Sequence, residues 1–224
     1  MKLPIILASV CFSINIHAQD CKNLYYLQSG KTVEMTIYSK KGNVTGKQVY
    51  NIGEVTSNNG IIGSTITSEM IDKDGKSINK STNKIQCNNG VLMMDLKMFI
   101  QGPQLEQIKN ADATGSVSYL EYPVDMKTGD KLKDADFNMD YTANGIGSNL
   151  TLNMSDRFVL GKDNVSSPAG SWDAFKIGYK SKIKMKVAGI GIPINMEVTE
   201  WYVPGFGIVK TESKYGSTLI TSIK

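Results

Sequence analysis

Apolar and polar residues alternate with a period of two along most of this chain, which is the pattern of half-buried β-strands. The alternation is clear over residues 33–37, 62–70, 92–100, 137–141 and 150–154. It is longest over 175–187, where every second position faces the apolar side and five of the positions between them are lysines. A strand with one charged face belongs to an antiparallel sheet, because parallel strands are usually buried on both faces.

Turn sequences divide the alternating segments at regular steps. Asn59-Gly60, Asp74-Gly75 and Asn89-Gly90 suit the two-residue turns of β-hairpins, whose central residues have positive φ. Their even spacing predicts an up-and-down meander of strands about ten residues long. We therefore expect an all-β, mainly antiparallel fold built as a single large curved sheet or open barrel. One short helix is predicted over 103–110, since Pro103 suits a first helical turn.

The first residues have the features of an export signal. A lysine at position 2 precedes the apolar segment Leu3–Ile16, which is too short for a transmembrane helix, and Ala18 offers a small residue for cleavage. The prediction is a cleaved signal peptide over 1–18 and a single β domain over 19–224, with no transmembrane span in the mature chain. An uncleaved anchor is the alternative. Export places the protein in the periplasm or outside the cell, with association with the outer membrane left open.

Two cysteines, Cys21 and Cys87, would remain after cleavage. An even pair in an oxidising compartment favours a disulfide, which would attach the start of the mature chain to its interior. Two separate buried thiols are the alternative.

Cleavage also removes His17, the only histidine. Without an imidazole the mature chain has no Ser-His or Cys-His nucleophile pair and no His-ligated zinc, and two cysteines cannot complete a zinc site. Two carboxylate pairs could act as acid and base in glycoside hydrolysis. Glu197 and Glu200 would point to opposite faces of one strand, and Asp134 and Asp136 fall in a predicted loop. The aspartates of 125–136 lack the spacing of a calcium loop and read as a solvated turn. We therefore predict a protein without enzymatic activity, metal or cofactor.

The balance of charge excludes another class of partner. Loss of Lys2 would leave 24 of the 25 basic side chains against 21 acidic ones, a net charge of +3. Arg157 is the only arginine. Because nucleic-acid readers depend on arginine for bidentate contacts, we expect no nucleic-acid binding.

Three segments of the C-terminal half resemble a known family in their order and spacing. They are Tyr122-Pro123 with 129–132, Pro168–Lys176, and Glu200–Lys210, which contains Trp201 and a Pro-Gly turn. Together they resemble the TapB-like family of exported bacterial envelope proteins of unknown function, which is in turn similar to the curved-sheet lipoprotein carriers of the LolA and LolB type. The resemblance implies a strongly curved sheet or open barrel in the cell envelope and brings no catalytic or binding residues.

The resemblance has departures. Ser171 and Trp172 replace the threonine and phenylalanine expected there, and Ala174 stands where a cysteine is often found, so no second disulfide is implied. Within 200–212, Pro204-Gly205 suits a type II turn. Trp201 and Phe206 are predicted to pack the last hairpin against the long strand at 175–187.

Methionine supplies the argument for a ligand. Eight methionines fall on strand faces predicted to be apolar, and methionine is over-used on surfaces that accept varied hydrophobic partners. The leading hypothesis is a non-enzymatic module that binds a lipid or a lipidated protein on its concave face. The candidate residues are Met94, Met98, Met139, Tyr141, Met154, Tyr179, Ile183 and Met185. The alternative is that these side chains fill a closed core.

A second hypothesis is an accessory protein of an envelope or secretion assembly, without a small ligand. The lysine row of 176–186 and the apolar hairpin of 188–193 would then be contact surfaces. Otherwise the lysines form a solvated face, and the hairpin either folds back over the sheet or meets a membrane. The volume enclosed by the sheet discriminates the two functions, because an open apolar cavity of several hundred Å³ favours ligand binding.

Overall fold

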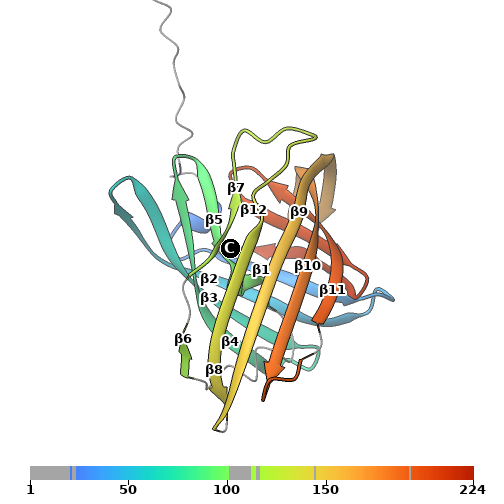
Figure 1. Ribbon diagram of the computed structural model, residues 1–224. Coiled ribbons are helices and arrows are strands. Elements are labelled where there is room, and N and C mark those ends of the chain that lie inside the picture. Colours follow the sequence, from blue (N-terminus) through green and yellow to red (C-terminus); the bar gives the residue numbers. More distant parts are fainter. Residues whose placement is uncertain (1–20, 22–23, 101–111, 115–116, 144, 192) are drawn as a thin grey trace, which may run out of the picture.

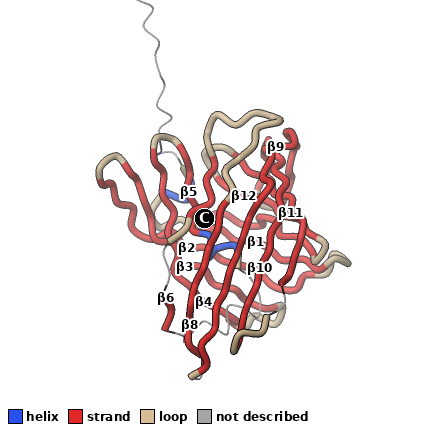
Figure 2. The backbone as a smooth tube through the Cα atoms, in the orientation of Figure 1, coloured by secondary structure: helices blue, strands red, loops and turns tan. Residues whose placement is uncertain are grey.

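The computed structural model describes residues 21, 24–100, 112–114, 117–143, 145–191 and 193–224. Within them the chain forms thirteen strands and two single turns of 3₁₀ helix, η2 (Tyr25–Leu27) and η3 (Leu96–Phe99). Figures 1 and 2 show how the strands are arranged in space. Neither helical turn is long or apolar enough to cross a membrane. The strands are β1 (Thr32–Ser39), β2 (Val44–Asn58), β3 (Ile61–Asp72), β4 (Ser77–Asn88), β5 (Val91–Asp95), β6 (Asp112–Thr114), β7 (Tyr119–Tyr122), β8 (Ala135–Ala143), β9 (Ile146–Ser167), β10 (Gly170–Val187), β11 (Pro193–Val203), β12 (Gly207–Ser213) and β13 (Gly216–Ile223).

All strands belong to one antiparallel sheet, which confirms the predicted fold class. Its order is β6-β8-β9-β10-β11-β12-β13-β1-β2-β3-β4-β5-β7. Two meanders, β1–β5 and β8–β13, are therefore joined where the last strand pairs with the first, from Val33 opposite Ile223 to Ser39 opposite Gly216. The sheet curves round into a nearly closed barrel (Figure 1).

The predicted hairpin turns lie where the sequence places them. Asn59 and Gly60 have φ values of 48° and 80°, and Asn89 and Gly90 repeat these values. Both central residues of these two turns thus have the positive φ that a type I′ hairpin requires. The two-residue turn predicted at Asp74-Gly75 is wrong, because β3 and β4 are joined by the longer connection 73–76 and only Gly75 of the pair has positive φ (85°). The Asp72 carboxylate accepts hydrogen bonds from the backbone N–H groups of Asp74 and Lys76 and so closes this connection.

Side chains that alternate along the strands fill the interior of the barrel. On β10 the inward residues Ile177, Tyr179 and Ile183 are buried, whereas Lys180 and Lys182 between them are exposed. The alternation therefore identifies correctly which face of the sheet is apolar.

The predicted strand over 92–100 is wrong in its second half. β5 ends at Asp95, whose carboxylate accepts a hydrogen bond of 3.0 Å from the backbone N–H of Lys97. This cap begins η3, so Met98 lies on a helical turn and not on a strand. The cap explains the difference, because local side-chain hydrogen bonds compete with a ladder. The helix predicted over 103–110 lies outside the described residues.

One end of the barrel, the closed end, is covered by the start of the described chain. Cys21 forms a disulfide with Cys87, with a Cα–Cα distance of 5.8 Å. The backbone N–H of Tyr25 donates to the Gly205 carbonyl at 3.0 Å, so η2 is held against the turn between β11 and β12. Tyr26 is buried there at 2 % exposure.

Phe206 joins this cover to the sheet. Its ring lies 4.9 Å from the ring of Tyr25, 6.0 Å from Tyr26 and 5.9 Å from Trp172 of β10. Trp201 is opposite Lys176 of β10 and donates from its indole nitrogen to Asp163 at 3.2 Å. Phe206 therefore packs on the N-terminal segment as well as on the start of the long strand.

Hydrogen bonds and an ion pair from side chains connect the two edges of the sheet. β6 and β7 are the edge strands, and no ladder joins them. Arg157 of β9 donates from Nη1 to the carbonyl oxygens of Glu121 (3.2 Å) and Lys133 (2.7 Å), which links β7 to the chain entering β8. Lys133 also pairs with Glu121 at 2.6 Å.

Candidate ligand-binding site

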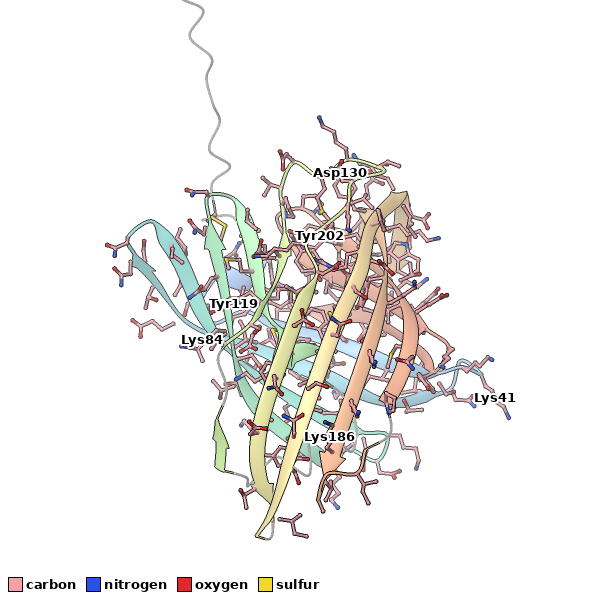
Figure 3. All side chains as sticks on the ribbon, in the orientation of Figure 1. Lys41, Lys84, Tyr119, Asp130, Lys186 and Tyr202 are labelled. Atoms are coloured by element: carbon pink, nitrogen blue, oxygen red, sulfur yellow. A yellow bond between two sulfur atoms is a disulfide. The ribbon has the colours of Figure 1, made fainter. Side chains whose placement is uncertain are left out.

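The barrel contains an apolar cavity of about 520 Å³ at the end opposite the cover. Strand ends from both meanders surround it, together with η3. Its lining side chains are mainly aliphatic, methionine and aromatic, with a few hydroxyls: Ile37, Thr45, Met70, Ile71, Ile78, Phe99, Met154, Tyr179, Ser181, Ile183, Ile194, Met196, Val198, Thr211, Ser213 and Tyr215. Figure 3 shows the side chains of the barrel as sticks on the ribbon.

The structure divides the predicted ligand-binding residues into three groups. Met154, Tyr179 and Ile183 line the large cavity. Met94 and Met98 line a separate void of about 50 Å³ deeper in the core. The remaining three belong to the core without lining either space: Met139 and Tyr141 are buried, and Met185 is half-buried.

Several lining residues were missed by sequence reasoning. Phe99 lies on η3 and lines both spaces, and it reaches them only because β5 stops at Asp95. Ile37, Met70, Ile194 and Met196 lie on faces that the alternation identifies as apolar. The alternation does not indicate which ends of the strands surround a cavity. The order of the hairpins along the chain is the signal that could have placed these four residues at the same end of the sheet.

A buried polar cluster lies next to this cavity. Arg157 and Glu200 have fully buried side chains, and Arg157 Nη2 lies 3.9 Å from Glu200 Oε1. The ring of Tyr122 stacks on Tyr202 with centroids 4.6 Å apart, and the Arg157 guanidinium lies 5.1 Å from the Tyr122 centroid. Tyr179 belongs to both the cavity wall and the polar cluster, because it lines the cavity and its hydroxyl interacts with the Glu200 carboxylate.

A β-bulge places the arginine inside the barrel. Gly178 of β10 pairs with Phe158 and Lys180 pairs with Ser155, so a single residue of β10 faces two of β9. Asp156 occupies the bulge with a φ of 54°. The extra residue reverses the alternation, since Leu152 and Met154 face inward before it and Arg157 and Val159 face inward after it.

Burial dominates the electrostatics of the cluster. It raises the pKa of Glu200 to about 7, although the Arg157 charge and the hydroxyls of Tyr122 and Tyr179 act to lower it. The same burial, with the nearby Glu200 charge, raises the pKa values of Tyr122 and Tyr179 well above 10. Neither carboxylate oxygen of Glu200 has a well-formed hydrogen bond among the described residues.

The arrangement is suited to holding the barrel together more than to chemistry. Glu200 and Arg157 have no exposed surface, and Glu197 lies on the opposite, exposed face of β11, as expected. No three His, Cys, Asp or Glu side chains gather closely enough to hold a metal ion in the described part of the chain. The apolar walls of the cavity, in contrast, are open to a ligand.

Solved structures share this architecture. One, described as a “putative exported protein with YmcC-like fold” from Bacteroides fragilis, has a TM-score of 0.72 and 20% identity, covering 90% of this chain and 98% of its own. Another, described as a “putative lipoprotein” from Parabacteroides distasonis, has a TM-score of 0.73 and 21% identity, covering 92% and 100%. At these identities the likeness establishes the fold.

No curated protein sequence is significantly similar to this chain. A family model, in contrast, matches nearly the whole of the barrel, over residues 28–222. The match spans β1 to β13 and includes every residue that lines the cavity. The chain therefore belongs to the DUF3108-like family.

Proposed function

We propose that this protein is a non-enzymatic component of the cell envelope that holds a hydrophobic ligand in the cavity of its barrel. The ligand is an acyl chain, either of a free lipid or of a lipidated partner. The observation that carries the proposal is the cavity itself, at about 520 Å³. Small-molecule sites fall in the range of about 300–1,000 Å³ and are predominantly apolar with a few polar groups.

The composition of the lining supports the same ligand class. Three methionines, Met70, Met154 and Met196, contribute flexible thioether chains. Such side chains adapt to partners of varied shape. The hydroxyls of Ser181 and Thr211 are among the few polar groups in the wall, which suits an alkyl chain better than a sugar or a nucleotide.

Envelope localisation is part of the proposal. It is supported by the signal-like first residues and by the two similar structures, one described as an exported protein and the other as a lipoprotein. The narrower resemblance to TapB-like proteins, and through them to LolA and LolB carriers, belongs here as well. It favours a carrier of lipid or lipoprotein over a structural element.

The second candidate function is an interaction accessory without a small ligand. The observation that favours it is the outer face of β10, where Lys180 and Lys182 form part of an exposed basic row. Under this alternative the cavity would be empty in the purified protein.

Extraction of the purified protein distinguishes ligand binding from the accessory role. The chain is expressed with its own leader, recovered after export without detergent, extracted with organic solvent and examined by mass spectrometry. A stoichiometric lipid or acyl species in the extract is the expected result. A clean extract, together with no fluorescence gain on adding the apolar dye N-phenyl-1-naphthylamine, would refute ligand binding and leave the accessory role.

A further inference from the structure

The end of the barrel at which the cavity lies is bordered by apolar side chains that point into solvent. Ile190 is 81% exposed, Tyr215 57%, Val44 52% and Val187 40%. We call these four side chains the mouth rim. They come from three different hairpin tips, β1/β2, β10/β11 and β12/β13.

Strand order brings these tips to one end of the sheet. Ser39 at the end of β1 pairs with Gly216 at the start of β13, and Ile183 and Lys184 near the end of β10 pair with Ile194 and Pro193. The cavity is lined by residues next to each tip, among them Ile37, Thr45, Ile194 and Tyr215 itself. The rim therefore borders the opening of the cavity.

The tip between β10 and β11 projects from the sheet and does not fold back over it. Val187 and Ile190 exchange backbone hydrogen bonds of 2.9 and 3.0 Å around a two-residue turn at Ala188 and Gly189. Both turn residues have positive φ, 50° and 81°. Tight hairpin tips normally carry polar residues such as Asn-Gly, whereas this one presents Ile190 at its end.

Lysines accompany the rim at the same tips. Lys40 and Lys41 lie in the β1/β2 tip, Lys186 at the end of β10 and Lys214 beside Tyr215, and all four are exposed. Among the described residues none of them forms an ion pair, whereas the β3/β4 tip balances Asp72 and Asp74 with Lys73 and Lys76. In Figure 3, Asp130 lies at the top, Lys186 toward the bottom and Lys41 at the right-hand edge of the molecule.

Among the described residues, no hairpin tip or loop at the closed end carries a large exposed apolar side chain. The longest loop at this end, 123–134, carries aspartates interspersed with lysines. Apolar side chains that project together with unpaired cations fit one kind of surface, a bilayer with anionic headgroups, in which the apolar groups enter the interface and the lysines stay at headgroup level.

We infer that the mouth rim docks the barrel onto an anionic lipid bilayer, with the cavity opening toward the acyl chains. The inference extends the proposed function, since docking in this orientation gives a lipid chain a direct path between bilayer and cavity. It is supported by the exposure and charge of the rim and does not require the cavity to be occupied.

Vesicle sedimentation tests the inference. The exported, purified chain is mixed with vesicles of phosphatidylcholine alone or with added phosphatidylglycerol. We expect co-sedimentation that increases with phosphatidylglycerol and falls at about 1 M salt, where charges are screened within a few ångströms. The double variant Ile190→Ser/Tyr215→Ser should bind about tenfold more weakly, because it removes two apolar groups from the interface.

The matched control is Leu160→Ser. Leu160 is 55% exposed on β9, between Val159 and Gly161, away from the rim. Its variant should sediment as wild type does, and all three proteins should melt at similar temperatures. The inference is overturned if wild type ignores anionic vesicles, if the double variant binds equally well, or if Leu160→Ser loses as much binding. A lipid in the extract without vesicle binding would overturn docking alone and leave the proposed function intact.

Discussion

At the scale of single residues, the least expected feature is a lone arginine buried beside a carboxylate. A buried ion pair is weak evidence for stability, because desolvation of both charges opposes their attraction. Arg157 is nevertheless retained as a connector, donating to carbonyls on both sides of the seam between β7 and β8. Glu200 is then left with a raised pKa of about 7.

This pKa predicts a stability that depends on pH. Since the folded value lies above the ordinary 4.5, the folded state holds an extra proton between about pH 4.5 and 7, and the stability associated with Glu200 falls as pH rises through that window. Over that window the free energy of unfolding falls by on the order of 3 kcal/mol. Glu200→Gln should match wild type near pH 5 and exceed its free energy of unfolding near pH 8, as measured by urea denaturation.

The control for this measurement is Glu197→Gln, on the exposed face of the same strand. It should follow the wild-type pH profile. A Glu200→Gln protein whose stability declines with pH as steeply as wild type would show that the buried carboxylate does not titrate in this window.

At the scale of elements, the sheet is held by its turns and by the segment that covers one end. Gly207 opens β12 with a φ of 132°, and a Cβ placed there would lie 2.7 Å from the ring of Tyr26 in η2. Gly205, two residues earlier, also has positive φ (80°) but would place its Cβ in open space. The corner between β11 and β12 is therefore shaped to receive the N-terminal segment.

Two alanine variants separate strain from contact. Gly205→Ala should lower the free energy of unfolding by about 1–2 kcal/mol, because alanine is strained in a left-handed backbone conformation. Gly207→Ala should lower the free energy of unfolding by about 1–3 kcal/mol more, because the new methyl group overlaps the ring of Tyr26, which must then move. Chemical denaturation of both variants checks the difference, and equal losses would contradict the close packing of η2 on the corner.

Local sequence signals predict some of these elements and not others. The alternation on β10 and the Asn-Gly turns are local signals, and they predicted strands, faces and hairpin tips correctly. The end of β5 at Asp95 and the bulge at Asp156 were missed. Each depends on a single residue whose local hydrogen bond or positive φ prevails over a pattern that would otherwise continue.

At the scale of the whole molecule, the barrel has two unlike ends. The disulfide, η2 and Phe206 close one end, whereas the cavity lies at the other behind the mouth rim. Neither end could be predicted from periodicity, because the pairing of β13 with β1 and the position of the cover are long-range properties. Of the eight predicted ligand-binding residues, Met154 of β9 and Tyr179 and Ile183 of β10 lie in the cavity wall, whereas Met185, nearer the end of β10, does not.

The most direct test of ligand binding uses neighbouring residues on opposite faces of β10. Ser181 lines the cavity and is buried, whereas Lys182 next to it is exposed on the outer face. Ser181→Trp should fill the cavity and abolish most of the fluorescence gain of N-phenyl-1-naphthylamine, while Lys182→Trp should bind the dye as wild type does, with both proteins folded by circular dichroism. Equal dye binding by the two folded variants would contradict the claim that the barrel interior is the ligand site.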